Sequence, residues 1–145
     1  MPEKARILVV ANRTAESPEL LDALRTRAVH GSCEFTLLVP ATAHGLAWAA
    51  DMHAGASEAE EHRRAFVEEL REEGLDVRDA KVGDADPLAA VCDECNFNAY
   101  DELIVSTLPL KMSKWLHVDL PRKARAATGL SVQHVVASES KAVAR

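Results

Sequence analysis

The chain has 145 residues, of which 48% are hydrophobic and 28% charged, a balance typical of one globular domain with its own core. Its formal net charge of −6 excludes a general attraction to nucleic acid or to an anionic membrane. The apolar runs are too short for a membrane span or a secretory signal, and three cysteines are too few for a disulfide framework. We therefore expect a single domain over residues 1–145, in the cytoplasm, with no nucleic-acid or membrane partner.

Apolar runs of strand length alternate with helical patterns along the chain, which predicts repeated βα units and a parallel sheet. The first strand is predicted at Ile7–Ala11, an entirely aliphatic run. The helix that follows has Ser17 as its N-cap, Pro18 in its first turn and Gly31 after its last residue. The second strand, Phe35–Val39, is again mostly apolar, so both strands are expected inside the sheet with helices on its two faces.

The second helix is expected to start near Ser57 and Glu60, which have the spacing of a capping box, and to end at Gly74. The third strand, Leu75–Val82, includes several charged residues. A strand of this composition tolerates water on one side, so we expect it at an edge of the sheet.

The second half of the chain continues the alternation. Asp86 and Pro87 begin the third helix, and the aliphatic run Leu103–Val105 predicts the fourth strand. The fourth helix is expected to begin near residue 120 and to end at Gly129. The last strand, Ser131–Ala137, contains polar residues and is therefore predicted at the other edge of the sheet.

Two edge strands in third and fifth place, with right-handed crossovers, predict an α/β domain with a five-stranded parallel sheet of order 3-2-1-4-5. In such sheets ligands bind outside the carboxyl ends of the strands, where the strand order reverses, which here lies between strands one and four. The candidate ligand-binding residues at this place and on the neighbouring rim are Asn12, Arg13, Thr14, Pro40, Ala41, Gly83, Asp84, Ser106, Thr107, Lys111, Ser113 and Lys114.

The segment from Ser106 to Lys114 is the strongest part of this candidate site. Its three hydroxyl groups and two lysines can hold a phosphate or a carboxylate. The alternative interpretation is a solvated loop in which Pro109 sets a turn and the hydroxyls bond to local backbone.

Cys92 and Cys95 form a CxxC pattern two turns into the third helix, on the face of Leu88 and Val91. A redox pair normally lies at a helix N-terminus, and no second pair of ligands completes a zinc site, so we expect two core residues.

Other catalytic and metal patterns are missing from the sequence. It contains no phosphate-binding lysine loop, no nucleophile elbow and no zinc-binding helix motif. His44, Asp51, His53 and His62 lack the spacing of metal ligands. Asp84, Asp86 and Asp119 are better explained as turn and cap residues than as acids or bases. We therefore expect no catalytic residue and no metal.

Four segments, Arg6–Val10, Val82–Pro87, Tyr100–Ser106 and Thr128–Val136, together resemble the universal stress protein family in their order and spacing. The resemblance implies a five-stranded parallel domain of order 3-2-1-4-5 that is often dimeric through its last strand, here Ser131 to Ala137. ATP-binding members carry a glycine-rich stretch after strand four, GxxG followed by Gly-Ser or Gly-Thr. Residues 106–116 contain no glycine, and Asn12 stands where nucleotide binders usually have an acidic residue. ATP is therefore expected to bind weakly or not at all.

This resemblance favours a homodimeric small-ligand-binding or regulatory module that does not act through turnover. The cofactor stays open between none, a nucleotide and a small anion. One alternative is a dimer without a ligand that acts by protein contacts, through a hydrophobic loop around Trp48 and through its last strand. The other alternative is a hydrolase or transferase acting on a nucleotide or a phosphorylated compound at the place where the strand order reverses.

Overall fold

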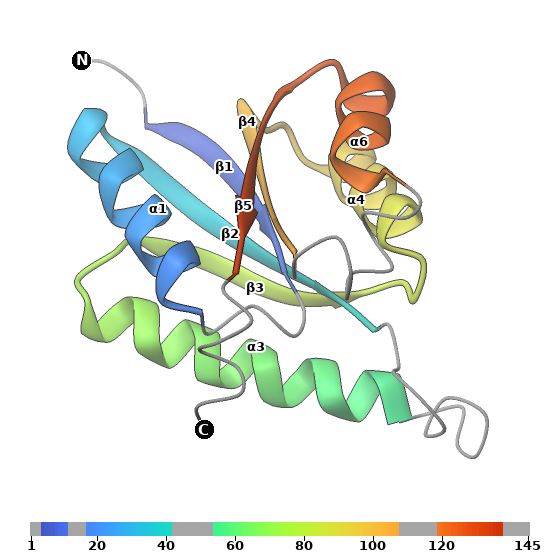
Figure 1. Ribbon diagram of the computed structural model, residues 1–145, viewed down its shortest axis with the longest axis horizontal. Coiled ribbons are helices and arrows are strands. Elements are labelled where there is room, and N and C mark those ends of the chain that lie inside the picture. The colour runs from blue at the N-terminus through green and yellow to red at the C-terminus, as the bar shows by residue number, and fades with distance from the viewer. Residues whose placement is uncertain (1–3, 12–16, 42–53, 108–118, 138–145) are drawn as a thin grey trace.

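The aliphatic run near the amino terminus forms the central strand of a parallel sheet. The computed structural model describes residues 4–11, 17–41, 54–107 and 119–137. Its strands are β1 (Ala5–Val10), β2 (Cys33–Pro40), β3 (Val77–Gly83), β4 (Glu102–Thr107) and β5 (Ser131–Val136). The helices are α1 (Pro18–His30), α3 (Ala54–Glu72), α4 (Pro87–Phe97) and α6 (Leu120–Thr128), arranged as Figure 1 shows.

The strands pair in the order β3-β2-β1-β4-β5, and every pairing is parallel. The predicted strand order is confirmed, with β3 and β5 at the edges. Val10 of β1 is opposite Leu38 of β2 on one side and opposite Val105 of β4 on the other. Because β1 and β4 are adjacent and parallel, their carboxyl ends are neighbours, and the strand order reverses between them.

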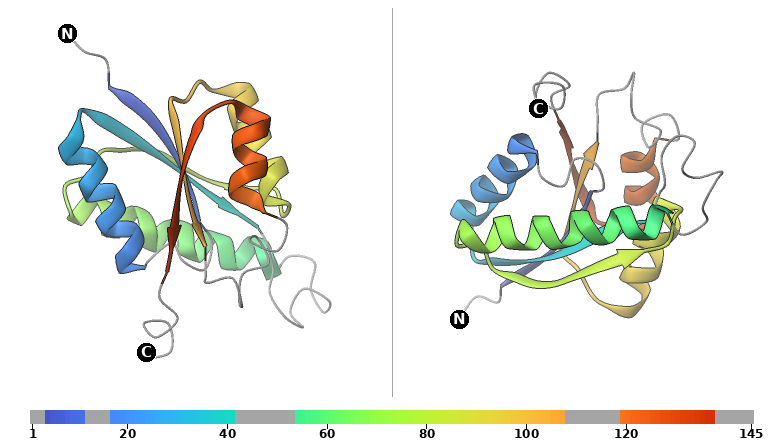
Figure 2. Two further views of the ribbon diagram at one scale, coloured as in Figure 1. Left: turned by 45° about the horizontal axis from the view of Figure 1, so that its top comes forward. Right: turned by 90° about the horizontal axis from the view of Figure 1, so that it is seen from below.

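Helices cover both faces of the sheet, which explains why β1 is aliphatic on both sides. Helices α1 and α3 lie on one face, and α4 and α6 lie on the other (Figure 2). Ile7 and Val9 join the core under α1 and α3, whereas Leu8 and Val10 join the core under α4 and α6, all with 0% exposure. Full burial of such a side chain contributes roughly 1.5–3 kcal/mol. The strand therefore stabilises both layers at once.

Local capping residues set most helix ends where the sequence predicts them. The Ser17 hydroxyl accepts a hydrogen bond from the Leu20 amide at 3.2 Å. The Asp86 carboxylate caps α4 by accepting from the Leu88 amide at 3.0 Å. Gly74, after α3, has a φ of +78°, a left-handed conformation that side chains rarely adopt. These interactions depend on neighbouring residues alone, so the sequence reveals them.

The predicted start of the second helix is wrong. Helix α3 begins at Ala54, so Ser57 lies within the helix and not before its first residue. The small residues before Ser57 continue the helix, and Glu60 accepts instead from Arg63 at 2.9 Å. Asp119 does occupy the N-cap position of α6, but with a φ of +56° and no side-chain capping bond.

Candidate functional site

The carboxyl ends of the strands form one edge of the sheet, where the predicted site is located. Backbone bonds hold the strand ends together: the Ala11 amide donates to the Leu38 carbonyl at 3.2 Å, and the Ala41 amide donates to the Gly83 carbonyl at 3.0 Å. The described candidates along this edge are Pro40, Ala41, Gly83, Asp84, Ser106 and Thr107. The other candidates, Asn12, Arg13, Thr14, Lys111, Ser113 and Lys114, lie outside the described residues.

Ser106 and Thr107 are strand residues and not part of the loop in which the sequence analysis placed them. They end β4, pair with Val135 and Val136 of β5, and are 1% and 2% exposed. The predicted fourth strand stopped at Val105 because both following residues are polar. Pairing with β5 extends the strand, since the Ala137 amide also donates to the Thr107 carbonyl at 2.8 Å.

His134 is a polar residue at this edge that the sequence analysis used only as a sign of an edge strand. Its Nε2 lies 2.7 Å from the Thr107 hydroxyl oxygen, which joins β5 to the end of β4 through side chains. The residue faces solvent, yet desolvation of its ring lowers the pKa of His134. The imidazole is therefore largely neutral at pH 7 and binds Thr107 as a neutral partner.

Gly83 and Asp84 have structural roles at the rim. A Cβ atom on Gly83 would lie 2.8 Å from Leu38 Cδ1 and 2.9 Å from Ala90 Cβ, so only glycine lets α4 pack this closely on β2 and β3. The Asp84 carboxylate accepts a hydrogen bond from the Asp86 amide at 2.8 Å, which forms the turn before α4. The predicted turn and cap roles of Asp84 and Asp86 are confirmed.

A buried carboxylate on α4 was missed by the sequence analysis. Glu94 is 7% exposed, and its oxygens accept hydrogen bonds from Tyr100 Oη at 2.5 Å, Asn98 Nδ2 at 2.9 Å and Lys81 Nζ at 2.9 Å. Desolvation raises the pKa of Glu94, but the bonds from Tyr100 and Lys81 outweigh it and leave the pKa lowered. Burial and the bond to Glu94 raise the pKa of Tyr100. Glu94 is thus an ionised carboxylate whose oxygens accept hydrogen bonds from three donors.

Cys92 and Cys95 on the same helix are both half-buried, and Cys95 packs against the core under α4 and α6. Burial raises the pKa of the Cys95 thiol to about 11, which opposes formation of a reactive thiolate. The prediction of a core residue is thus supported for Cys95. Cys92 is not part of this core cluster, and Glu94, which is 7% exposed, is deeper than either cysteine.

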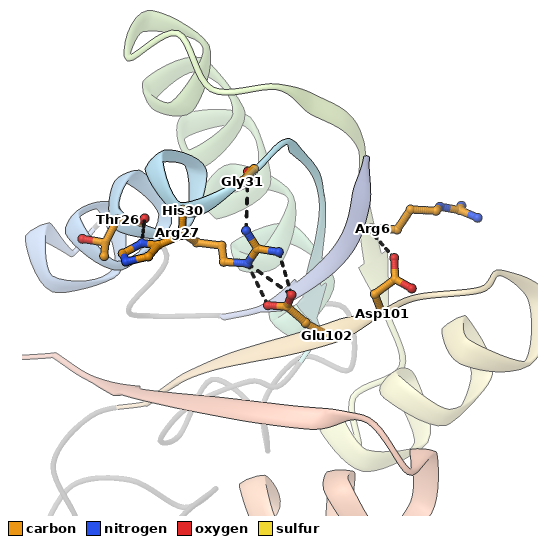
Figure 3. A network of polar contacts seen from close by, with 7 residues as sticks. All are labelled: Arg6, Thr26, Arg27, His30, Gly31, Asp101 and Glu102. Carbon is orange, nitrogen blue, oxygen red and sulfur yellow. Dashed lines mark hydrogen bonds and ion pairs between the residues drawn. The ribbon is translucent and has the colours of Figure 1, made fainter. Parts of the chain in front are cut away.

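The amino end of the sheet is held by a second set of polar contacts. In Figure 3 the Arg27 guanidinium reaches from α1 to the Glu102 carboxylate at the start of β4, with N···O distances of 2.9 and 2.7 Å. The bond to Glu102 raises the pKa of Arg27. The Asp101 carboxylate accepts from the Arg6 amide at 2.8 Å. These contacts occupy the edge opposite the candidate site and join α1 to the middle of the sheet.

The described residues contain neither a cluster of metal ligands nor a membrane-spanning helix. Within those ranges no group of three histidine, cysteine, aspartate or glutamate side chains is arranged to hold a metal ion. No described helix is long and apolar enough to cross a membrane. Three of the four residues considered as metal ligands, His44, Asp51 and His53, lie outside those ranges.

Solved structures of similar fold exist. The chain is similar to a universal stress protein family protein from Arabidopsis thaliana with AMP bound, with a TM-score of 0.64 and 14% identity over 94% of each chain. A universal stress protein in complex with cAMP has a TM-score of 0.62 and 14% identity, covering 92% of this chain and 98% of that one. A universal stress protein from Lactobacillus plantarum has a TM-score of 0.63 and 13% identity, covering 93% of this chain and 99% of that one.

No protein-family model matches the sequence, and no curated protein is significantly similar to it. The chain has the universal stress protein fold, as the sequence resemblance implied.

Proposed function

We propose that the chain is a ligand-binding or regulatory module of the universal stress protein type, with a small nucleotide or another small anion as its ligand. One observation carries the proposal: over more than nine-tenths of its length the chain shares its fold with structures that hold AMP and cAMP. The carboxyl ends of β1 and β4, where the strand order reverses, are the place where such sheets bind ligands. We assign the ligand to this edge.

The composition of the segment after β4 determines which anions fit the proposal. Residues 106–116 contain no glycine, so backbone amides cannot closely surround a triphosphate. Lys111 and Lys114 are the charged residues of this segment, and each can neutralise part of a single phosphate as a point charge. We therefore expect AMP, cAMP or inorganic phosphate to bind better than ATP.

Thermal unfolding with a panel of these anions tests the proposal. A ligand at a hundred times its Kd stabilises the folded state by about 2.7 kcal/mol, which raises Tm by about 5–15 °C in a domain of this size. AMP or cAMP should give a larger shift than ATP. The shift should shrink in Lys111→Ala and Lys114→Ala, and should persist in the matched control Lys123→Ala, which removes an exposed lysine of α6.

Two results would contradict this proposal. The absence of a Tm shift with AMP, cAMP and phosphate at millimolar concentration would contradict the proposal that a small nucleotide or anion is the ligand. A full ATP shift that survives the double substitution of Lys111 and Lys114 would place the phosphates elsewhere. Release of phosphate from AMP or ATP under the same conditions would instead favour the hydrolase alternative.

We also propose a homodimer formed through β5. The outer edge of β5 pairs with no strand in the described ranges, and Val136 on it is 45% exposed. An open strand edge with an exposed apolar side chain favours pairing with a second copy. Light scattering at tens of micromolar should give the mass of a dimer, and Val136→Lys should shift it toward the monomer. A monomer mass for the unmodified chain would contradict the proposal.

The proposed location is the cytoplasm. Cys33, Cys92 and Cys95 are all free thiols, which suits a reducing compartment. Cell fractionation tests this, and recovery of the protein outside the cytoplasmic fraction would contradict it.

A further inference from the structure

A groove with a volume of about 190 Å³ lies between the carboxyl half of β3 and the helix α4. Leu38 and Ala90, each 3% exposed, form its apolar floor. Sites for drug-sized molecules typically measure about 300–1,000 Å³, so this groove suits a smaller body. Of the described residues in the candidate anion site, Gly83 and Asp84 also line this groove.

The charges that line the groove favour a cation. Lys81 and Glu94 neutralise each other, because the ammonium group lies 2.9 Å from one carboxylate oxygen and 3.1 Å from the other. Two exposed carboxylates remain at the mouth, those of Asp84 and Asp93. Asp84 uses one oxygen to accept from the Asp86 amide, and the Asp93 carboxylate has no hydrogen bond or ion pair with the described residues. An anion would be repelled by this mouth, and a cation attracted.

An aromatic ring completes the mouth. Phe97, the last residue of α4, lines the groove and is 85% exposed. The face of an exposed aromatic ring attracts cations, with a strength of about 0.5–1 kcal/mol. A ligand with a positive group and a short apolar body would pack its apolar part on the groove floor. Its positive group would contact Phe97 and neutralise the charge of the carboxylates.

We propose that this groove binds a small alkylammonium ion. Its apolar body packs on Leu38 and Ala90, and its ammonium group lies between the carboxylates of Asp84 and Asp93 and the ring of Phe97. This groove binds a cation, whereas the site proposed above at the ends of β1 and β4 binds an anion. Neither proposal depends on the other.

Titration with n-butylammonium chloride, followed by amide proton and nitrogen NMR shifts, tests the site. Saturable shifts are expected at Gly83, Asp93 and Phe97. Sodium butyrate has the same apolar body with the opposite charge, and it should leave these amides unchanged. A titration with AMP in the same spectra separates the two proposals, because anion binding is expected at Ala11 and Ala41 and not at Asp93 or Phe97.

Matched substitutions measure the two recognition elements. Asp93→Asn removes one carboxylate charge, and Phe97→Leu removes the aromatic face but keeps an apolar side chain. Each should raise the Kd for n-butylammonium about two- to fivefold. Asp22→Asn removes an exposed aspartate of α1, on the opposite face of the sheet, and should leave the Kd unchanged.

The proposal is overturned if butyrate shifts the same amides as strongly, or if the n-butylammonium shifts do not saturate up to tens of millimolar. It is also overturned if Asp93→Asn weakens binding no more than Asp22→Asn does. Saturable, cation-specific shifts that both groove variants weaken would support it.

Discussion

Replacing Lys81 with methionine should destabilise the domain by leaving the Glu94 carboxylate buried without its cation. The Glu94 side chain is 8% exposed, and the Lys81 side chain is 36% exposed. Exposed ion pairs contribute about 0.2–1 kcal/mol, whereas removing one partner of a fully buried pair costs about 3–5 kcal/mol. Lys81 is screened by solvent, and Tyr100 and Asn98 still donate to Glu94, so the cost is discounted to about 1–3 kcal/mol.

Urea unfolding followed by circular dichroism measures this cost. The matched control is Lys4→Met, which removes a lysine from the exposed pair with Asp76, whose side chains are 51% and 46% exposed. The loss of unfolding free energy should be clearly smaller for the control than for Lys81→Met. Equal losses would refute the assignment of a special role to the buried carboxylate.

The pH dependence gives a second check on the same residues. The pKa of Glu94 is lowered in the folded state, so its stabilisation is present above the ordinary carboxyl pKa and is lost as pH falls through the lowered pKa. The difference between the unmodified chain and Lys81→Met should therefore be full at pH 7 and shrink in acid, where Glu94 is protonated in both proteins. A difference that stays constant from pH 7 into acid would refute the reasoning.

Three further substitutions follow from local geometry and can be measured in the same unfolding assay. Gly83→Ala should cost about 1–3 kcal/mol, because Ala90 cannot move away from the new methyl group without shifting α4; an unchanged midpoint would contradict this close approach. Ser17→Ala should cost about 1 kcal/mol by removing the cap of α1, and a neutral result would mean that water replaces the hydroxyl. Cys95 should react with a thiol reagent at pH 8 much more slowly than Cys92, because burial raises its pKa to about 11; equal rates would contradict that burial.

Most of the fold was predictable because it depends on local signals and on one burial pattern. The aliphatic β1 has to be covered on both faces, and the charged β3 needs an edge, so composition separates central from edge strands and right-handed crossovers set the order. The caps at Ser17 and Asp86 bond to amides two or three residues away, so nothing distant influences them. The start of α3 was not predictable in this way, because the capping-box spacing of Ser57 and Glu60 indicates a later start than the helix has.

Sequence predicts the location of the candidate site, at the carboxyl edge of the sheet, but not the roles of its individual residues. Parallel strands put their carboxyl ends on one edge, which is why Ala41 and Gly83 were expected there and are hydrogen-bonded to each other. The roles of individual residues were less accessible. Gly83 was selected as a ligand contact, whereas its lack of a Cβ serves the packing of α4 on Leu38 and Ala90.

The sequence by itself determined the strand order, the two-sided core and most of the helix ends, since each follows from periodicity or from neighbouring residues. Tertiary structure alone decided which face of α4 goes inward. Helical spacing from Val91 allows either Glu94 or Cys95 to face inward. Glu94 is selected by the groups that donate to it, Lys81 on β3 and Tyr100 after the end of α4. Tertiary structure also extended β4 through Thr107, because a polar residue joins a strand when a neighbouring strand satisfies its backbone groups.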